Sequence, residues 1–222
     1  MWKAKISVYD ETGLFATLAK KHNITIQGYM LNYFSRRNHF YFTLIVFLNF
    51  NDKIRKNFIT DISQAKRVDK FEDQGNFLIC ELKIPNRLEK ERKPSLFYNP
   101  ELIQIAPFVI TPDGWEELEF ASFERKHLEN VLKISEKAYN LKLHYLKEEK
   151  VENFGVISAL PLLTEKQRNT LNIAIENGYY EYPRKTDVKK LSKKNKISFS
   201  TFQEHLRKAE NKLINFIYKK SK

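Results

Sequence analysis

Cysteine and glycine are scarce in this sequence. Of its 222 residues only Cys80 is a cysteine, and six are glycines. A single cysteine excludes an intrachain disulfide framework and any zinc site built from several cysteines. The sequence also lacks a glycine-rich phosphate loop, a nucleophile elbow and a paired catalytic motif. We therefore expect a protein that is not an enzyme and that carries no cofactor.

Long apolar runs are missing as well. No segment approaches the roughly 18 to 20 uninterrupted apolar residues that a membrane-spanning helix needs. The longest candidate, residues 40–50, is typical of a buried strand. Residues 1–6 lack the apolar core of a signal peptide. These absences predict a cytoplasmic protein with no membrane partner.

Metal-ligand spacing is absent too. Four scattered histidines are each expected to lie at the surface or to be hydrogen-bonded in the core: His22, His39, His127 and His144. The acidic run Glu116, Glu117 and Glu119 has no nucleophile motif or partner base, so we interpret it as a solvated strand edge. Cys80 alternates with apolar neighbours and is expected to act as a small buried hydrophobic residue. We predict no metal site.

Positive charge is plentiful and unevenly distributed. The chain is 42% hydrophobic and 30% charged, as in a folded protein, and its net charge is +12. Residues 158–222 contain fifteen lysines and arginines against six acidic residues, a balance of +9. Their apolar residues are regularly spaced, unlike those of a solvated basic tail. A small, folded, basic module predicts a polyanionic partner, most commonly nucleic acid.

Residues 1–85 carry strand and helix patterns in turn. Strand patterns cover residues 2–9, 24–34, 39–50, 68–72 and 76–84, and helical patterns cover 13–22 and 52–65. Their order is that of a ferredoxin-like or ACT-like antiparallel sandwich. The aromatic residues of the second and third strands form the sheet core, which we favour, or line an apolar ligand pocket: Tyr29, Tyr33, Phe34, Phe40, Tyr41, Phe42 and Phe47.

A second group of elements follows a polar segment. Residues 85–100 are charged and bracketed by prolines, and are the best candidate for a linker or long loop. Strands are expected over 102–111 and 115–123 around the turn Pro112-Asp113-Gly114, then a helix over 124–140 and a strand over 141–151. This group either repeats half of the first sandwich or extends its sheet. We expect residues 1–157 to form an α+β region that senses a ligand or forms a dimer. If the second group repeats half of the sandwich, the two halves are residues 1–85 and 100–152.

The remaining residues, 158–222, predict an all-helical domain that begins after the separating segment 154–163. Thr164 and Gln167 have the spacing of a capping box at a helix start. Leu171, Ala174 and Ile175 would form the buried face of this first helix, and Gly178 would end it in the left-handed conformation.

Two further helices are expected after a connector that contains Pro183. Thr186 would cap the second helix, which runs to about Lys194, and Ser198 would cap the third. Ile197 and Phe202 have the spacing of a hydrophobic staple across that cap. Six residues of the third helix form a coherent core stripe: Phe202, Leu206, Ala209, Leu213, Phe216 and Ile217.

The opposite face of the third helix is suited to DNA. A recognition helix presents its N-terminal face to base edges, while basic residues around it hold phosphates. Short hydroxyls allow close approach, Glu204 suits a cytosine amine, and Arg207 suits guanine or phosphate. We expect DNA contacts from Lys185, Lys189, Lys190, Lys193, Ser198, Ser200, Thr201, Gln203, Glu204, Arg207 and Lys208, with Lys194 adding to phosphate neutralisation.

These motifs also resemble a known family. Leu163-Thr164-x-Lys166-Gln167, Gly178-Tyr179-Tyr180-x-Tyr182-Pro183-Arg184 and Ser200-Thr201-x-x-Glu204-His205-Leu206-Arg207-x-Ala209-Glu210 follow one another without a large gap. Together they resemble the bacterio-opsin activator-type helix-turn-helix domain of archaeal regulators over about residues 160–217 and, more distantly, sigma-factor region 4. The resemblance implies sequence-specific control of transcription in an archaeal cytoplasm.

Our main hypothesis is accordingly a DNA-binding transcriptional regulator. A homodimer would place two third helices in successive major grooves of double-stranded DNA, and the N-terminal region would sense a small-molecule effector or dimerise. The alternative is an RNA-binding or small-molecule-processing protein that works through the ferredoxin-like region, since exposed aromatic rings on a sheet stack unpaired bases. A third possibility is an adaptor that binds partner proteins through its sheet.

Overall fold

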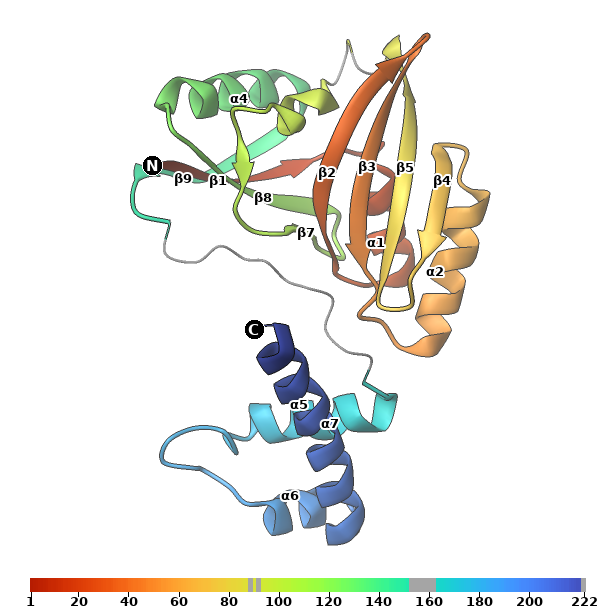
Figure 1. Cartoon of the computed structure of the whole chain (residues 1–222), viewed down its shortest axis with the longest axis vertical. Coiled ribbons are helices and arrows are strands. Elements are labelled where there is room, and N and C mark those ends of the chain that lie inside the picture. Colours follow the sequence, from red (N-terminus) through yellow and green to blue (C-terminus); the bar gives the residue numbers. More distant parts are fainter. Residues whose placement is uncertain (88–89, 91–92, 152–162, 221–222) are drawn as a thin grey trace. The chain divides into compact units, whose positions relative to one another are not determined.

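The computed structural model describes residues 1–87, 90, 93–151 and 163–220. Its contacts divide the chain into two compact units, Met1–Ser158 and Ala159–Lys222. The segment predicted to separate them, residues 154–163, lies almost wholly outside the described residues. The first unit is built around a β-sheet and the second from helices, which confirms the predicted α+β class (Figure 1).

One antiparallel sheet runs through the whole first unit. Its strands are β1 (Trp2–Tyr9), β2 (Ile26–Arg36), β3 (His39–Phe47), β4 (Val68–Asp73), β5 (Phe77–Pro85), β6 (Ile103–Gln104), β7 (Phe108–Ile110), β8 (Trp115–Ser122) and β9 (Asn140–Glu148). Their order is β4-β5-β3-β2-β7-β8-β1-β9, and β6 pairs with β8. The strands predicted for residues 1–85 are therefore all present.

The first strand belongs to the second half of this sheet. β1 pairs with β8 along its whole length and with β9 on its other side. The elements after residue 100 thus extend the sheet and do not form a separate half-copy. The term ferredoxin-like describes the order of the first elements but not their pairing. Strands β2 to β5 lie next to one another, whereas β1 pairs with β8 and β9. The order of elements could not reveal this, since pairing depends on contacts distant in sequence.

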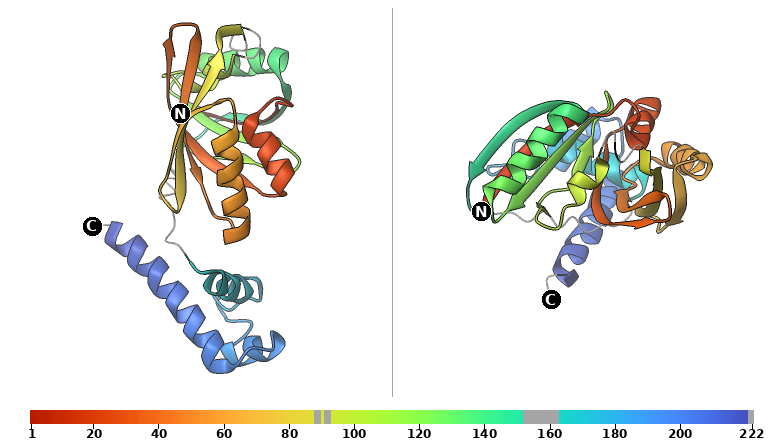
Figure 2. Two further views of the ribbon diagram at one scale, coloured as in Figure 1. Left: turned by 90° about the vertical axis from the view of Figure 1, so that its right-hand side faces the viewer. Right: turned by 90° about the horizontal axis from the view of Figure 1, so that it is seen from above.

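Among the described residues, the α-helices α1 (Leu14–His22), α2 (Asp52–Gln64) and α4 (Arg125–Ala138) pack on the sheet. Asn51 caps α2, and its side chain accepts a hydrogen bond from the backbone N–H of Ile54 at 2.9 Å. Helices α1 and α2 lie side by side, and α4 covers the part of the sheet formed by β1, β8 and β9 (Figure 2). Each helix turns an apolar face towards the sheet, and the side chains on that face are buried, as are Leu128 and Val131 of α4.

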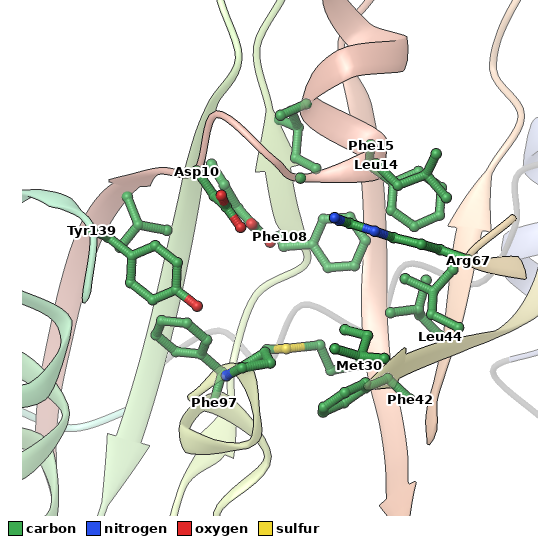
Figure 3. A pocket seen from close by; sticks show the side chains of 18 of the residues that line it. Asp10, Leu14, Phe15, Met30, Phe42, Leu44, Arg67, Phe97, Phe108 and Tyr139 are labelled. Carbon is green, nitrogen blue, oxygen red and sulfur yellow. The ribbon is translucent and has the colours of Figure 1, made fainter. Parts of the chain in front are cut away.

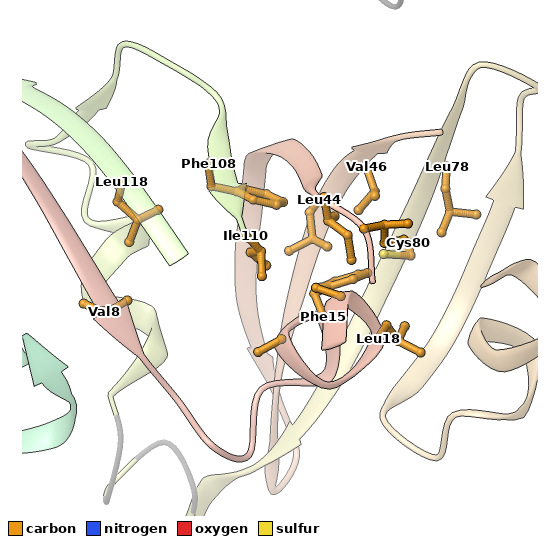
Figure 4. Close-up of a cluster of buried hydrophobic side chains, with 14 of the residues drawn as sticks. Val8, Phe15, Leu18, Leu44, Val46, Leu78, Cys80, Phe108, Ile110 and Leu118 are labelled. Atoms are coloured by element: carbon orange, nitrogen blue, oxygen red, sulfur yellow. The ribbon is translucent and has the colours of Figure 1, made fainter. Parts of the chain in front are cut away.

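The hydrophobic core joins both halves of the sheet. It combines Val8, Phe108 and Leu118 from β1, β7 and β8 with residues of α1 and of the strands β3 and β5 (Figure 4). Cys80 is part of it, as predicted, and burial raises the pKa of its thiol to about 12. The thiol therefore stays protonated at neutral pH.

Two stretches differ from their predictions. The predicted loop 85–100 contains a 3₁₀ helix, η1 (Pro94–Tyr98), and its residues Leu96, Phe97 and Tyr98 pack against the core. The predicted strand 102–111 is interrupted and forms β6 and β7. Ile105, between these two strands, is 3% exposed, so this part of the chain leaves the strand path and buries an apolar side chain.

No helix among the described residues has the length and apolarity to cross a membrane. In the same residues no three or more His, Cys, Asp or Glu side chains are arranged to hold a metal ion. Two of the histidines are hydrogen-bonded: His22 to Asp61 and His144 to Ser7, each at 2.7 Å.

Candidate nucleic-acid interface

The second unit contains α5 (Glu165–Glu176), α6 (Val188–Lys194) and α7 (Phe199–Lys220). The predicted capping box starts α5: the side chain of Gln167 accepts from Thr164 N, and Thr164 Oγ1 accepts from Gln167 N, at 3.1 and 3.3 Å. Gly178 follows the end of α5 with φ +76°, the left-handed conformation that glycine adopts without strain. The boundaries of this helix were therefore readable from the sequence.

Helix α6 is capped one residue later than predicted. The side chain of Asp187, rather than Thr186, accepts from the backbone N–H of Lys190 at 2.8 Å. A carboxylate also interacts favourably with the positive end of a helix, which a threonine does not. The helix consequently starts at Val188, and Val188 and Leu191 both face the core.

A tight turn joins α6 to α7. Lys196 adopts φ +54°, and the N–H of Ile197 returns to the carbonyl of Ser192 at 3.0 Å. The amide of Asn195 donates to the carbonyl of Leu191 at 2.8 Å. These bonds satisfy backbone groups at the end of α6, and four residues therefore suffice to reverse the chain. The pair α6 and α7 has the connectivity of a helix-turn-helix.

Ser198 begins α7 in the predicted way. Its hydroxyl accepts from the backbone N–H of Thr201 at 3.1 Å and contacts the hydroxyls of Ser200 and Thr201 at 3.0 and 2.8 Å. All three residues are exposed. The helix thus presents a cluster of short hydroxyl side chains in its first turn.

The buried face of α7 holds the unit together. Phe202, Leu206 and Ala209 are at most 2% exposed, and Phe202 and Leu206 form one core cluster with Ala174 and Leu191. The first three residues of the predicted core stripe are therefore confirmed. Leu213 and Phe216 are half-buried, and the side chain of Ile217 lies outside the described residues.

Two apolar residues predicted to pack are exposed instead. Ile175 is 55% exposed, because the buried stripe of α5 follows Thr170 and Ala174 and position 175 lies about 100° beyond it. Ile197, predicted to pack on Phe202 across the cap, is 37% exposed. The predicted contact between Ile197 and Phe202 stays a prediction.

The face opposite this core carries the predicted base-reading residues. Ser200, Thr201, Glu204, Arg207 and Lys208 are all exposed, and Gln203 is half-buried. Glu204 pairs with Lys208 one turn later at 2.5 Å, and this lysine lowers the pKa of the Glu204 carboxyl. Arg207 forms no hydrogen bond or ion pair through its side chain with any described residue. Its guanidinium is available to an external partner.

The lysines before α7 fall into two groups. Lys185 and Lys190 pair with Glu181 and Asp187 at 2.5 and 3.7 Å. Lys189 and Lys193 are exposed and form no recorded ion pair within the described part of the chain. Since exposed pairs are weak, all four are able to turn towards an anion.

The connector between α5 and α6 also contributes exposed groups. Tyr180 donates a hydrogen bond to Glu210 of α7 at 2.6 Å, which ties the connector to this helix. The Arg184 guanidinium lies over the ring of Tyr179 at 4.6 Å, and Tyr182 is fully exposed. Neither Tyr182 nor Arg184 was among the predicted contacts. Both residues lie in an exposed, basic connector, and this feature of the sequence would have justified adding them to the predicted DNA contacts.

The comparison with known proteins agrees with this geometry. Residues 163–215 match a family model described as an HTH DNA binding domain, so this part of the chain is a helix-turn-helix domain of the bacterio-opsin activator type. Transcriptional regulator NarO of Haloferax volcanii is 42% identical over 55 residues, which are 25% of this chain and 26% of that protein. A putative transcriptional regulator of the same organism is 42% identical over 52 residues, 23% of this chain and 9% of that protein. The matched stretch is thus about a quarter or less of each relative.

Proposed function

We propose that this protein is a DNA-binding transcription regulator in which α7 reads the major groove. The carrying observation is the exposed face of α7, which presents hydroxyls and Arg207 on a capped helix-turn-helix whose α6 adds exposed lysines. From Ser200 to Lys208 the helix rises ~12 Å, about the width of the major groove of B-DNA. The match to a DNA-binding family and the names of the two relatives support the same function.

Different residues would have different tasks. Ser200, Thr201, Gln203, Glu204 and Arg207 would face base edges, and Lys208 would leave Glu204 for a phosphate. The basic residues Lys185, Lys189, Lys190 and Lys193, with Ser198, would hold the backbone. Phosphate contacts carry affinity and salt dependence, whereas base contacts carry sequence preference, so the two groups are separable by experiment.

The first test measures the affinity of the full chain for duplex DNA over a range of salt concentrations. Changing Lys189, Lys190 and Lys193 together to alanine is expected to weaken binding to all sequences and to lower the salt slope by up to about 2.7. The control removes the same charge from exposed lysines of α2 and α4, as Lys53→Ala, Lys56→Ala and Lys133→Ala, and should leave the slope unchanged. Undetectable or salt-insensitive binding of the unchanged protein would overturn the proposal.

The second test addresses sequence preference. Sites bound by the intact protein are mapped on genomic DNA and compared with unrelated duplexes. The double variant Ser200→Ala, Arg207→Ala is expected to lose discrimination between these sites more than its general affinity, by about 1–3 kcal/mol for one bidentate base contact. Equal losses on all sequences would assign both residues to the backbone.

The regulator would act as a homodimer in the cytoplasm. One short reading helix contacts few base pairs, and two-fold assemblies predominate among oligomers, so two copies would read half-sites about 34 Å apart. The N-terminal unit would supply the pairing surface or sense an effector. Sedimentation of the full chain with and without DNA tests this assembly. A single chain bound to a single half-site would contradict it.

A further inference from the structure

The N-terminal unit contains a cavity of about 150 Å³. Its walls are mainly apolar and come from distant parts of the chain, among them Phe15 of α1, Met30 of β2, Leu44 of β3, Phe97 of η1 and Phe108 of β7 (Figure 3). The volume is similar to that of an engineered apolar cavity that binds benzene. A small apolar group of about the size of a benzene ring therefore fits in this cavity.

Three charged residues also line this cavity: Asp10, Arg67 and Glu116. Glu116 is brought there by the register of β8, where it alternates with the buried residues Leu118 and Phe120 and so shares their face. No hydrogen bond or ion pair joins its carboxyl to another described side chain. Glu116 is half-buried and lines the cavity.

Of the other two charged residues, Asp10 lies in the loop between β1 and α1, and Arg67 precedes β4 and contacts this loop. Asp10 accepts from the backbone N–H of Thr12 at 2.9 Å, and Arg67 donates to the carbonyl of Thr12 at 2.6 Å. Figure 3 shows Asp10 and Tyr139 pointing their oxygen atoms into the space between Phe97 and Phe108, with Arg67 reaching in from the other side. Arg67 is thus engaged with the backbone, and no recorded ion pair links it to Glu116.

The local electrostatics favour a cation. Burial, and after it the negative charge of Asp10, raises the pKa of Glu116 to about 7. Burial and the nearby Glu116 also raise the pKa of the Tyr98 hydroxyl. An added positive charge would favour the ionised carboxyl of Glu116 and would give it a partner, which no described side chain provides.

Aromatic rings surround the same space. Phe97 stacks on Phe120 at a centroid distance of 6.2 Å, and Tyr98 contacts Phe42 at 5.0 Å. Aromatic faces attract organic cations, especially where water is excluded. Apolar walls, aromatic faces and carboxyl groups together define one class of ligand.

We propose that this cavity binds a small organic ammonium ion, with the apolar body among the aromatic side chains and the ammonium group on Glu116 and Asp10. This ligand is the effector of the regulator. The binding itself does not depend on the proposed function, whereas the effector role rests on it.

The binding test uses the full chain and three probes of similar size: benzylamine, benzyl alcohol and benzoate. Calorimetric titration is expected to detect benzylamine and to show at least tenfold weaker binding of the other two, since a charged hydrogen bond is lost. Glu116→Gln should lower the affinity for benzylamine at least tenfold and leave that for benzyl alcohol unchanged. Tightest binding by benzoate, or binding by none of the three, overturns the proposal.

A neighbouring carboxylate provides the matched control. Glu117 points to the other face of β8 and pairs with Lys5 at 2.9 Å. Glu117→Gln removes the same charge from the adjacent residue and should not change the affinity for benzylamine. An equal loss in both variants would indicate attraction by overall charge and would overturn the site.

The effector role is tested by measuring DNA affinity with and without benzylamine. We expect a change in the unchanged protein and none in Glu116→Gln, which binds DNA normally without ligand. Binding of benzylamine with no change in DNA affinity would overturn the effector role alone. If the unchanged protein bound benzylamine but did not bind DNA under either condition, the proposed function would be contradicted and the ammonium site would still be supported.

Discussion

Glu204 and Glu116 show how differently the two units use charge. Glu204 lies on the exposed face of α7, where Lys208 lowers its pKa, and Glu116 lines an apolar cavity, where burial raises its pKa to about 7. The first carboxyl is ionised at neutral pH and is available for exchange with a solvent-side partner. The second is poised between two protonation states and is paired with no described side chain. A carboxylate at the surface exchanges its partner with water or a base amine, whereas a carboxyl inside an apolar cavity points to a specific cationic ligand.

The units also differ in how much core supports their sites. The cluster of buried residues in the C-terminal unit consists of Ala174, Leu191, Phe202 and Leu206, and the N-terminal unit has a far larger one. Stability in the small unit therefore depends strongly on single side chains. Four predictions test this contrast, in order of decreasing effect on the free energy of unfolding.

Truncating Phe202 should have the largest effect. Phe202 is fully buried, so Phe202→Ala is expected to cost about 3–5 kcal/mol and to unfold the C-terminal unit. DNA binding should disappear, while the N-terminal unit keeps its own melting transition in calorimetry. Phe199→Ala removes the same ring from a position that is 48% exposed and should cost well under ~1 kcal/mol. A comparable loss in both variants would contradict the buried position of Phe202.

Glu116→Gln should stabilise the N-terminal unit at high pH. The native carboxyl has a pKa of about 7 against an ordinary 4.5, so the native state binds more protons between these values and its stability falls as the pH rises through them. The variant should match the unchanged protein near pH 4 and be about 3 kcal/mol more stable near pH 8. Chemical denaturation at both pH values measures this difference.

The groups that face Glu116 stay in place in this variant, namely Asp10, Arg67, Tyr98 and Tyr139. Glu117→Gln, on the outer face of β8, should show no such gain at pH 8 because it loses the contact with Lys5. A variant at position 116 that is less stable than the unchanged protein at pH 8 would show that Glu116 has a compensating partner.

Local signals allowed much of the C-terminal unit to be predicted. The capping box of Thr164, the left-handed Gly178 and the cap of Ser198 each depend on residues at most four apart, and all are present. The error at α6 is equally local, because two adjacent residues, Thr186 and Asp187, both suit a helix cap. Short-range hydrogen bonds thus explain both the success and the one-residue slip.

Long-range pairing limited what could be predicted for the N-terminal unit. The strands were found from their patterns, but nothing in residues 2–9 reveals that they pair with residues 115–122 and 140–148. Glu116 was interpreted as part of a solvated edge together with Glu117 and Glu119. The alternation of Glu116 with Leu118 and Phe120 was the available signal, and its meaning depends on which face of β8 is covered.

Removing the cap of α7 should have an intermediate effect. Ser198→Ala leaves the N–H of Thr201 without its partner and should cost about 1 kcal/mol of the stability of the C-terminal unit. Ser198→Asp retains a capping side chain but adds negative charge where a phosphate is proposed. It should preserve the melting temperature and still weaken DNA binding. If both variants lose DNA affinity only in proportion to stability, Ser198 serves the fold alone.

The exposed pair Glu204 and Lys208 should contribute least to stability. Both side chains are more than half exposed, so Glu204→Gln and Lys208→Gln are expected to leave the melting temperature of the C-terminal unit unchanged. Their effects on DNA should differ in sign. Lys208→Gln loses a phosphate contact, leaves the charge of Glu204 facing the DNA, and should lower the salt slope by about 0.9. Glu204→Gln should raise the affinity for unrelated duplexes and lose discrimination at sites where a cytosine amine is its partner. If Glu204→Gln raised the affinity equally for every DNA sequence, Glu204 would only repel DNA. It would then not belong to the residues that read bases.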